Sequence, residues 1–69
     1  MKEIDVRGLS CPEPIMQVAQ ALKAFPGEEL KVLLSEAHSF KNVENFAKDK
    51  GLNVEGGPVD LEYELIIRP

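Results

Sequence analysis

Cys11 is the residue best able to do covalent chemistry in this chain, and it is the chain's only cysteine. Pro12 follows it directly, and Pro14 comes two residues later, where a segment with helical periodicity begins. Proline is tolerated in the first turn of a helix, because the backbone donors there have no partner in any case. A helix start also carries roughly half a positive charge, which can stabilise a nearby thiolate. The spacing is therefore compatible with a nucleophilic cysteine.

The two prolines also indicate how the thiol is presented. Pro12 disfavours the helical conformation for the residue before it, so Cys11 is predicted to lie just outside the helix, with Pro14 keeping the first turn from fraying. The prolines are thus expected to position the thiol more than to support the core. A free cysteine is more commonly a small buried hydrophobic residue. The spacing alone leaves both interpretations open.

Two other side chains could assist a reactive thiol. His38 is the single histidine, and it would follow the second strand at the sheet edge where Cys11 lies. It could act as a base, although a loop histidine is more often only solvated. Glu13 could act as a general acid or could simply complement the helix dipole. One cysteine and one histidine do not supply the four ligands of a structural zinc site, so we expect no metal and no cofactor.

The hydrophobic pattern identifies the elements that would position Cys11. Ile4 and Val6 alternate with charged residues, which predicts a short strand that ends at Gly8. A helix is predicted to begin at Cys11 or just after it and to end near residues 25–27, because apolar residues recur at helical spacing: Ile15, Val18, Ala19 and Leu22. A second, more apolar strand follows, with Leu30, Val32 and Leu34 on one face.

The second half of the chain repeats the helix and adds two strands. Ser39 is a credible N-cap for a helix that ends at Gly51, with a buried stripe made of Phe40, Val43, Phe46 and Ala47. Leu52 and Val54 predict a short third strand, and Gly56-Gly57-Pro58 predicts a turn. The fourth strand alternates apolar and charged residues from Leu61 to Arg68.

The order βαβαββ predicts an α/β fold, a two-layer sandwich with a mixed four-stranded sheet and two helices on one face. The other face should be exposed to water, because charged residues occupy the opposite strand parity: Glu3, Asp5, Lys31, Glu62 and Glu64. With 69 residues, the chain has room for one domain, residues 1–69.

Charge and composition narrow the classes of function. The chain carries 8 basic and 12 acidic side chains, a formal net charge of −4, which argues against direct binding of nucleic acid through a broad basic surface. No apolar run approaches the roughly 20 residues that span a bilayer, and the N-terminus lacks a signal-peptide core. A lone thiol suits a reducing compartment. We therefore expect a cytoplasmic monomer without a membrane partner.

The segment around the cysteine resembles the TusA/SirA-like family of small sulfur-carrier proteins. The motif of that family is Asp-x-x-Gly-Leu-x-Cys-Pro-x-Pro, which corresponds here to Asp5, Gly8, Leu9, Cys11, Pro12 and Pro14. The resemblance extends over nearly the whole chain, with the expected βαβαββ order and with Phe46 and Gly51 in their usual places. Many members place Arg or Lys immediately before the cysteine, whereas this chain has Ser10. Relatives often have Asp-Pro after the second strand, where this chain has Glu36-Ala37-His38.

The resemblance implies a carrier rather than a stand-alone enzyme. Cys11 would accept sulfane sulfur as a persulfide from a cysteine desulfurase or similar donor and relay it to an acceptor protein, in tRNA thiolation or cofactor biosynthesis. The rest of the motif and Glu13 would support the cysteine loop. Two alternatives remain: a regulatory or protein-interaction module of the same fold without sulfur transfer, and a thiol redox protein. The second is weakened by the absence of a resolving cysteine.

Overall fold

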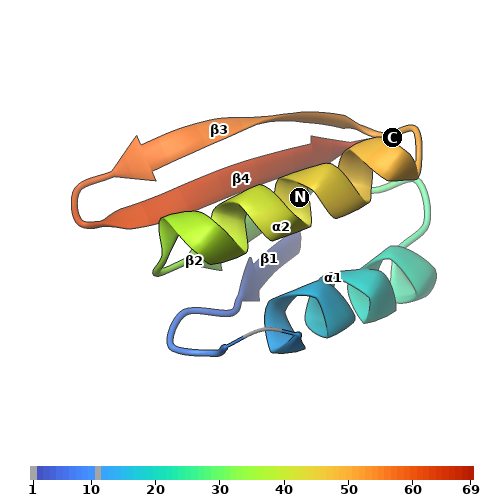
Figure 1. The fold of residues 1–69 in the computed structure, drawn as a ribbon. Coiled ribbons are helices and arrows are strands. Elements are labelled where there is room, and N and C mark those ends of the chain that lie inside the picture. The colour runs from blue at the N-terminus through green and yellow to red at the C-terminus, as the bar shows by residue number, and fades with distance from the viewer. Residues whose placement is uncertain (1, 11) are drawn as a thin grey trace.

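A computed structural model describes residues 2–10 and 12–69 of the chain. Figure 1 shows a sheet with two helices packed on one of its faces. The elements follow in the order β1 (Lys2–Asp5), α1 (Glu13–Ala24), β2 (Leu30–Leu34), α2 (Ala37–Asp49), β3 (Asn53–Val59) and β4 (Glu62–Arg68). The predicted α/β two-layer sandwich with βαβαββ order is confirmed.

The sheet has the strand order β1-β2-β4-β3, so β2 and β4 are central. β1 and β2 are parallel and pair Ile4 with Val32, while β4 is antiparallel to both of its neighbours. Parallel strands end at the same edge of a sheet. The chain segments that leave β1 and β2 therefore begin side by side, and both helices start at this edge (Figure 1).

The core lies between the helices and one face of the sheet. Cross-strand pairs on this face join Leu30 with Ile67 and Val32 with Leu65. The helices cover these pairs with apolar side chains, and Ser39 on α2 is the buried polar residue among those that the structure describes. The buried hydrophobic residues are Val6, Val18, Ala21, Leu30, Val32, Leu34, Val43, Ala47, Leu65 and Ile67.

The buried face of α1 is rotated from the predicted one. Val18 is fully buried as expected, but Ile15, Ala19 and Leu22 are only half-buried. The fully buried positions are instead Pro14, Val18 and Ala21, which follow the i, i+4, i+7 spacing of a helix face. Sequence periodicity identified the helix, but it did not determine which face of the helix is fully buried.

The predicted N-cap of α2 is wrong by three residues. Glu36 has an extended backbone (φ −131°, ψ 143°) and is the N-cap, and its carbonyl accepts the first helical hydrogen bond from the Phe40 N–H at 3.0 Å. Ser39 lies inside the first turn, and 4% of its surface is exposed. The short link from β2 and the high helix propensity of Ala37 extend the helix toward its N-terminus. The predicted end is confirmed, because Gly51 has φ +79°.

The predicted turn at Gly56-Gly57-Pro58 is also wrong, because these three residues belong to β3. The chain turns instead at residues 60–61, where Asp60 takes a φ of +57°. β3 is an edge strand, and an edge strand tolerates proline where its nitrogen needs no partner. Gly56 permits a close approach that a side chain would block, since a Cβ there would lie 2.1 Å from the Glu64 backbone oxygen.

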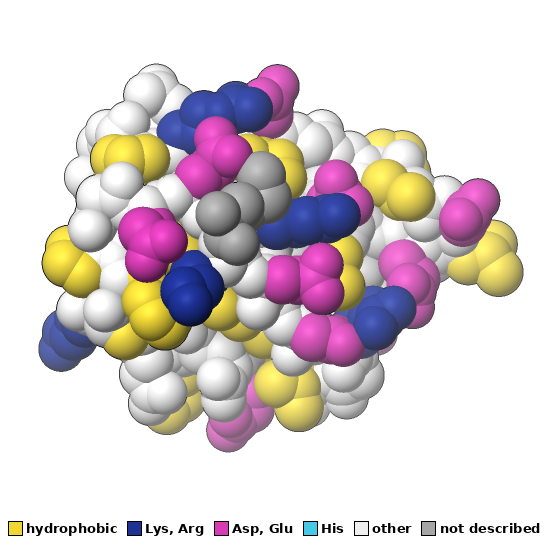
Figure 2. Space-filling model, turned by 180° about the vertical axis from the view of Figure 1, so that it is seen from behind, with side chains coloured by type: hydrophobic (Ala, Val, Ile, Leu, Met, Phe, Trp, Pro, Cys, Tyr) yellow, Lys and Arg dark blue, Asp and Glu magenta, His cyan; other side chains and the backbone are white. Residues whose placement is uncertain are grey.

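The open face of the sheet is charged, as predicted, and Figure 2 shows acidic and basic side chains interleaved over it. Lys31 on β2 pairs with Glu64 on β4 at 3.3 Å, and Arg68 pairs with Glu29 at 2.6 Å. Arg68 also pairs with Glu55 on the edge strand. These carboxylates raise the pKa of Arg68. Exposed ion pairs contribute little stability each, so the charge pattern mainly keeps this face hydrated.

Candidate functional site

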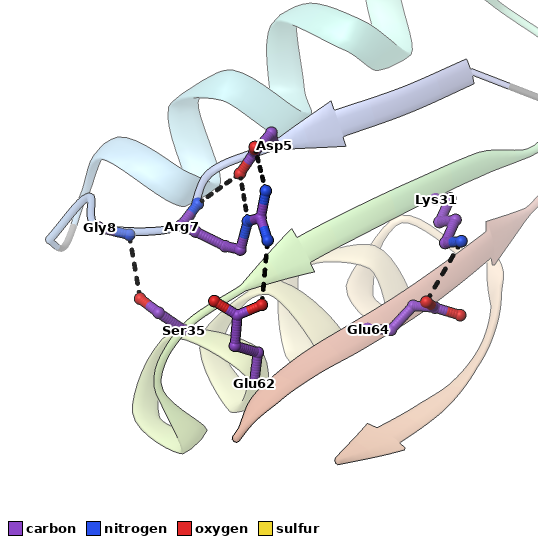
Figure 3. Close-up of polar contacts among 7 residues, drawn as sticks. All are labelled: Asp5, Arg7, Gly8, Lys31, Ser35, Glu62 and Glu64. Carbon is purple, nitrogen blue, oxygen red and sulfur yellow. Dashed lines mark hydrogen bonds and ion pairs between the residues drawn. The ribbon is translucent and has the colours of Figure 1, made fainter. Parts of the chain in front are cut away.

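The chain leaves β1 through a turn that is held by side-chain hydrogen bonds. The Asp5 carboxylate accepts hydrogen bonds from the Arg7 N–H at 3.1 Å and from the Arg7 guanidinium Nε at 2.9 Å (Figure 3). A carboxylate that bonds to the backbone two residues later stabilises a turn directly after a strand. The same guanidinium reaches Glu62 at the start of β4, with an N–O distance of 3.0 Å. This pair links the turn to β4, across the intervening strand β2.

Gly8 directs the next part of the loop. It has a φ of +80°, and the Leu9 N–H donates to the Val6 carbonyl at 3.3 Å, which is the pattern of a type II turn. The Gly8 N–H donates to Ser35 Oγ at 3.0 Å, just beyond the end of β2 (Figure 3). Glycine takes this left-handed conformation without steric strain. The turn therefore sends the chain toward α1 and is held against the neighbouring strand.

α1 begins directly after the cysteine position. Pro12 is its N-cap, Glu13 is its first residue, and the Met16 N–H donates to the Pro12 carbonyl at 3.1 Å. Cys11 itself lies outside the described residues, so its predicted placement is not tested. The described neighbours on both sides, Leu9, Ser10, Pro12 and Glu13, are all exposed.

The role predicted for Pro14 needs correction. Its side chain is among the largest that are fully buried, with less than 2% exposed, whereas Pro12 is exposed. Pro14 therefore supports the core as well as the helix start. Position 14 lies on the buried face of α1, together with Val18 and Ala21.

We expect the two prolines to respond differently to substitution. Pro14→Ala removes ring methylenes from the core and should lower the free energy of unfolding by about 1–2 kcal/mol. Pro12→Ala should change it by less than about 1 kcal/mol, since its side chain is exposed. Urea denaturation of the two single variants measures the difference. Equal losses would show that Pro14 has no special role in packing.

The Arg7 interaction predicts a pH dependence of stability. Hydrogen bonds from Arg7 lower the pKa of Asp5 from 3.8 to about 2. A carboxyl group whose pKa is lower when folded stabilises the fold above its unfolded pKa, and this stabilisation is lost as pH falls from about 4 through 2. Asp5→Asn keeps an oxygen for the Arg7 N–H but removes the charge. Over this pH range, the variant should therefore lose less stability than the wild type in acid titrations followed by circular dichroism. Parallel curves for the two proteins would show that protonation of Asp5 does not cause the loss.

The candidate base, His38, lies in the first turn of α2. Its Nε2 is 3.5 Å from the Asn42 amide nitrogen, one turn further along the same helix. A histidine in this position shares the helix-start edge with the loop after β1. His38 thus has a partner on its own helix, and a catalytic contact with Cys11 stays a prediction.

A metal site and a membrane-spanning helix each set requirements for the residues that the structure describes. Residues 2–10 and 12–69 hold no group of three or more His, Asp or Glu residues arranged to bind a metal ion. In the same part of the chain, neither helix has the length and apolar character needed to cross a bilayer.

A groove of about 330 Å³ lies between the C-terminal halves of the two helices, where Leu22, Phe46 and Leu52 contribute to its wall. It is at the opposite end of α1 from the cysteine position and is not part of this site.

The motif positions converge on the loop, but the sequence did not reveal all of its supports. Asp5 is the last residue of β1, Gly8, Leu9 and Pro12 lie in the β1–α1 connection, and Pro14 lies in the first turn of α1. Arg7, Ser35 and Glu62 were not identified, although each makes a hydrogen bond that fixes the loop. Glu62 is 55 residues from Arg7, so only the strand pairing brings them together. For Ser35 the sequence holds one weak indication of a role in the loop, which is that a polar residue directly follows a buried strand.

Comparisons with known proteins agree with the resemblance seen in the motif. Residues 2–68 match the family model described as Sulfurtransferase TusA. A proposed sulfur carrier protein of Methanocaldococcus jannaschii is 36% identical over 55 residues, which cover 78% of this chain and 73% of that protein. The sulfur carrier protein TusA of Allochromatium vinosum is 37% identical over 51 residues, which cover 72% of this chain and 67% of that protein.

A solved structure shows the same architecture. The crystal structure of a SirA-like protein from Desulfitobacterium hafniense matches with a TM-score of 0.89 and 27% sequence identity. The match covers 99% of this chain and 96% of that one. The fold predicted from the sequence pattern is therefore shared with an experimentally determined structure.

Proposed function

Because this chain belongs to the TusA sulfurtransferase family, a family of sulfur carriers, we propose that Cys11 receives sulfane sulfur as a persulfide and relays it between proteins. The donor in this proposal is a cysteine desulfurase. The acceptor is a second protein that uses the sulfur for tRNA thiolation or cofactor biosynthesis. The protein acts as a carrier and needs no cofactor of its own.

The observation that carries the proposal is the construction of the loop around position 11. A type II turn, an ion pair and two hydrogen bonds from Arg7 and Gly8 hold the segment that precedes the cysteine. The helix start holds the segment that follows it, and the described neighbours at positions 9, 10, 12 and 13 are exposed. Exposed flanks that are held in place on both sides support presentation of a thiol at position 11 to another macromolecule.

The chemistry needs one nucleophile. The Cys11 thiolate attacks the outer sulfur of the donor's persulfide, a new S–S bond forms at Cys11, and the donor's S–S bond breaks to release the donor thiolate. Sulfur moves between two thiols with no net oxidation, so no external oxidant is required. The helix start favours the thiolate, whereas Glu13 in the first turn opposes it.

Intact-protein mass spectrometry tests the proposal. After incubation with a cysteine desulfurase and free cysteine, the protein should gain the mass of one sulfur atom, and a reductant should remove it. A desulfurase without free cysteine provides the control. A protein whose mass stays unchanged with the desulfurase and with small-molecule persulfides would contradict the carrier function.

A further inference from the structure

We propose that the end of the molecule around position 11 docks the persulfide-donating desulfurase through an apolar surface formed by Leu9, Met16, Val59 and Leu61. This docking surface rests on the proposed carrier function. The docking surface gives a role to the β3–β4 hairpin, which the sulfur-transfer chemistry itself does not use. The surface fits a partner protein that has an apolar recess rimmed by Lys or Arg side chains.

The four residues stand out by their exposure. Leu61 is 93% exposed, Met16 and Val59 are each 49% exposed, and Leu9 is 36% exposed. They are the large hydrophobic residues that are exposed in the described part of the chain. Single exposed hydrophobic residues are common, but exposed hydrophobic residues gathered at one end of a small domain indicate a binding surface.

Strand pairing places the hairpin tip at the same end as the cysteine loop. Leu34, the last residue of β2, pairs with Tyr63 near the start of β4, and Val59 pairs with Glu62. β1 ends beside β2 in parallel, so the hairpin tip and the loop after β1 extend beyond the same sheet edge (Figure 1). The ion pair between Arg7 and Glu62, at 3.0 Å, spans the two segments directly.

Leu61 has no structural reason to be hydrophobic. It occupies the turn of the hairpin and is almost fully exposed, so it adds nothing to the core. Residues of this turn are usually polar or glycine, as Asp60 is with its φ of +57°. A leucine at the most exposed hydrophobic position described is therefore best explained by burial against a partner, since interface anchors gain affinity from such burial.

Charge defines the chemistry of the partner. The segments that form this end are residues 5–16, residues 34–40 and residues 59–62. They contain one basic side chain, Arg7, and these five acidic ones: Asp5, Glu13, Glu36, Asp60 and Glu62. The rest of the chain holds seven basic and seven acidic side chains, so the formal net charge of −4 is concentrated here.

The single cation at this end is not free to attract an anionic partner. Both Asp5 and Glu62 bind Arg7, at 2.8 and 3.0 Å, and these carboxylates raise the pKa of Arg7. A partner with basic side chains around an apolar recess would therefore match both the charge and the hydrophobic residues. Such side chains would also bring positive charge near position 11, where Ser10 supplies none.

Leu61→Ser tests the docking surface with little risk to folding, because the side chain makes no core contact. We expect kcat/KM for sulfur transfer from a persulfidated desulfurase to fall about tenfold or more. Val59→Thr, which keeps a β-branched side chain on β3, should cause a smaller loss. Asn53→Ser, at the opposite end of β3 and also exposed, is the matched control and should react at the wild-type rate.

Loading by glutathione persulfide separates this proposal from the carrier function, because so small a donor needs no docking surface. If Leu61→Ser is slow with the desulfurase but normal with glutathione persulfide, the docking surface is supported. Equal rates of wild type and Leu61→Ser with the desulfurase would overturn it, as would a wild type that only the small donor can load. If neither donor loads the wild type, the carrier function itself fails and the docking proposal fails with it. Transfer from the desulfurase should also slow as salt rises.

Discussion

Cys11→Ser is expected to abolish loading of the protein with sulfur, from a desulfurase and from a small persulfide alike. The chain has no second cysteine, so no other side chain can form the S–S bond. A serine hydroxyl is similar in size but cannot hold sulfane sulfur at neutral pH. Intact mass after incubation with each donor measures the loss, which should be complete rather than partial.

Moving the thiol by one residue tests whether sulfur transfer depends on the position of the thiol and not only on its presence. The variant that combines Cys11→Ser with Ser10→Cys has the same composition and places its thiol one residue before the predicted position. We expect a small persulfide to load it, but the desulfurase to load it at least about tenfold more slowly than the wild type, because reaction depends on orientation. Cys11→Ser should keep the wild-type melting temperature, since the described flanking residues are exposed. Loading of Cys11→Ser would contradict the assignment of this residue.

Gly56→Ala is expected to be the most destabilising single methyl addition in the hairpin. A Cβ at this position would lie 2.1 Å from the Glu64 carbonyl oxygen and 2.9 Å from the Leu65 Cα, both backbone atoms of the adjacent central strand. The strands would have to separate where the sheet supports the core. Overpacking of this kind costs about 3 kcal/mol, which is a large share of the roughly 3–10 kcal/mol expected for a domain of this size.

Gly57→Ala is the matched control for that prediction. It lies one residue further along the same strand, and a Cβ there would meet no atom within 4 Å. Its effect on the free energy of unfolding should be close to zero or slightly stabilising, because alanine restricts the unfolded chain. Urea denaturation of both variants gives the comparison. Similar stabilities would show that the close approach of Gly56 to β4 is not needed.

The fold was predictable because hydrophobic periodicity specified each element. Alternation of side chains identified β2 and β4, and the helix between Pro14 and Phe25 had a clear apolar stripe. The helix between β1 and β2 then favoured parallel pairing of these strands, and a turn between the last two strands favoured an antiparallel hairpin. These signals are local, so a single sequence contains them.

The errors arose where tertiary contacts override local signals. Gly56-Gly57-Pro58 has the composition of a turn, yet it forms part of an edge strand because Gly56 allows the backbone of β4 to approach closely. Ser39 has the residue type of an N-cap, yet it packs inside the first turn and makes no hydrogen bond to the described residues. For Gly56 the deciding contact is with the neighbouring strand β4. For Ser39 the short link from β2 and the helix propensity of Ala37 move the N-cap to Glu36.

The motif of the candidate site could be predicted from the sequence, but the ion pair and the packing that hold its loop could not. Cys11, Gly8 and the prolines are contiguous, so their arrangement in one loop follows from the sequence. The ion pair from Arg7 to Glu62 depends on the strand order, in which β4 lies beside β2. The burial of Pro14 depends on how α1 is rotated against the sheet, which periodicity alone does not determine.

The central claim is that Cys11 holds transferable sulfur, and tandem mass spectrometry of the loaded protein tests it most directly. The wild type is loaded by a desulfurase with cysteine that contains a heavy sulfur isotope, separated from the donor and digested without reductant. We predict one heavy sulfur atom on the peptide that contains Cys11, and its complete release as sulfide when a thiol is added. Heavy sulfur that is absent from this peptide, or that a thiol cannot release, would contradict the account.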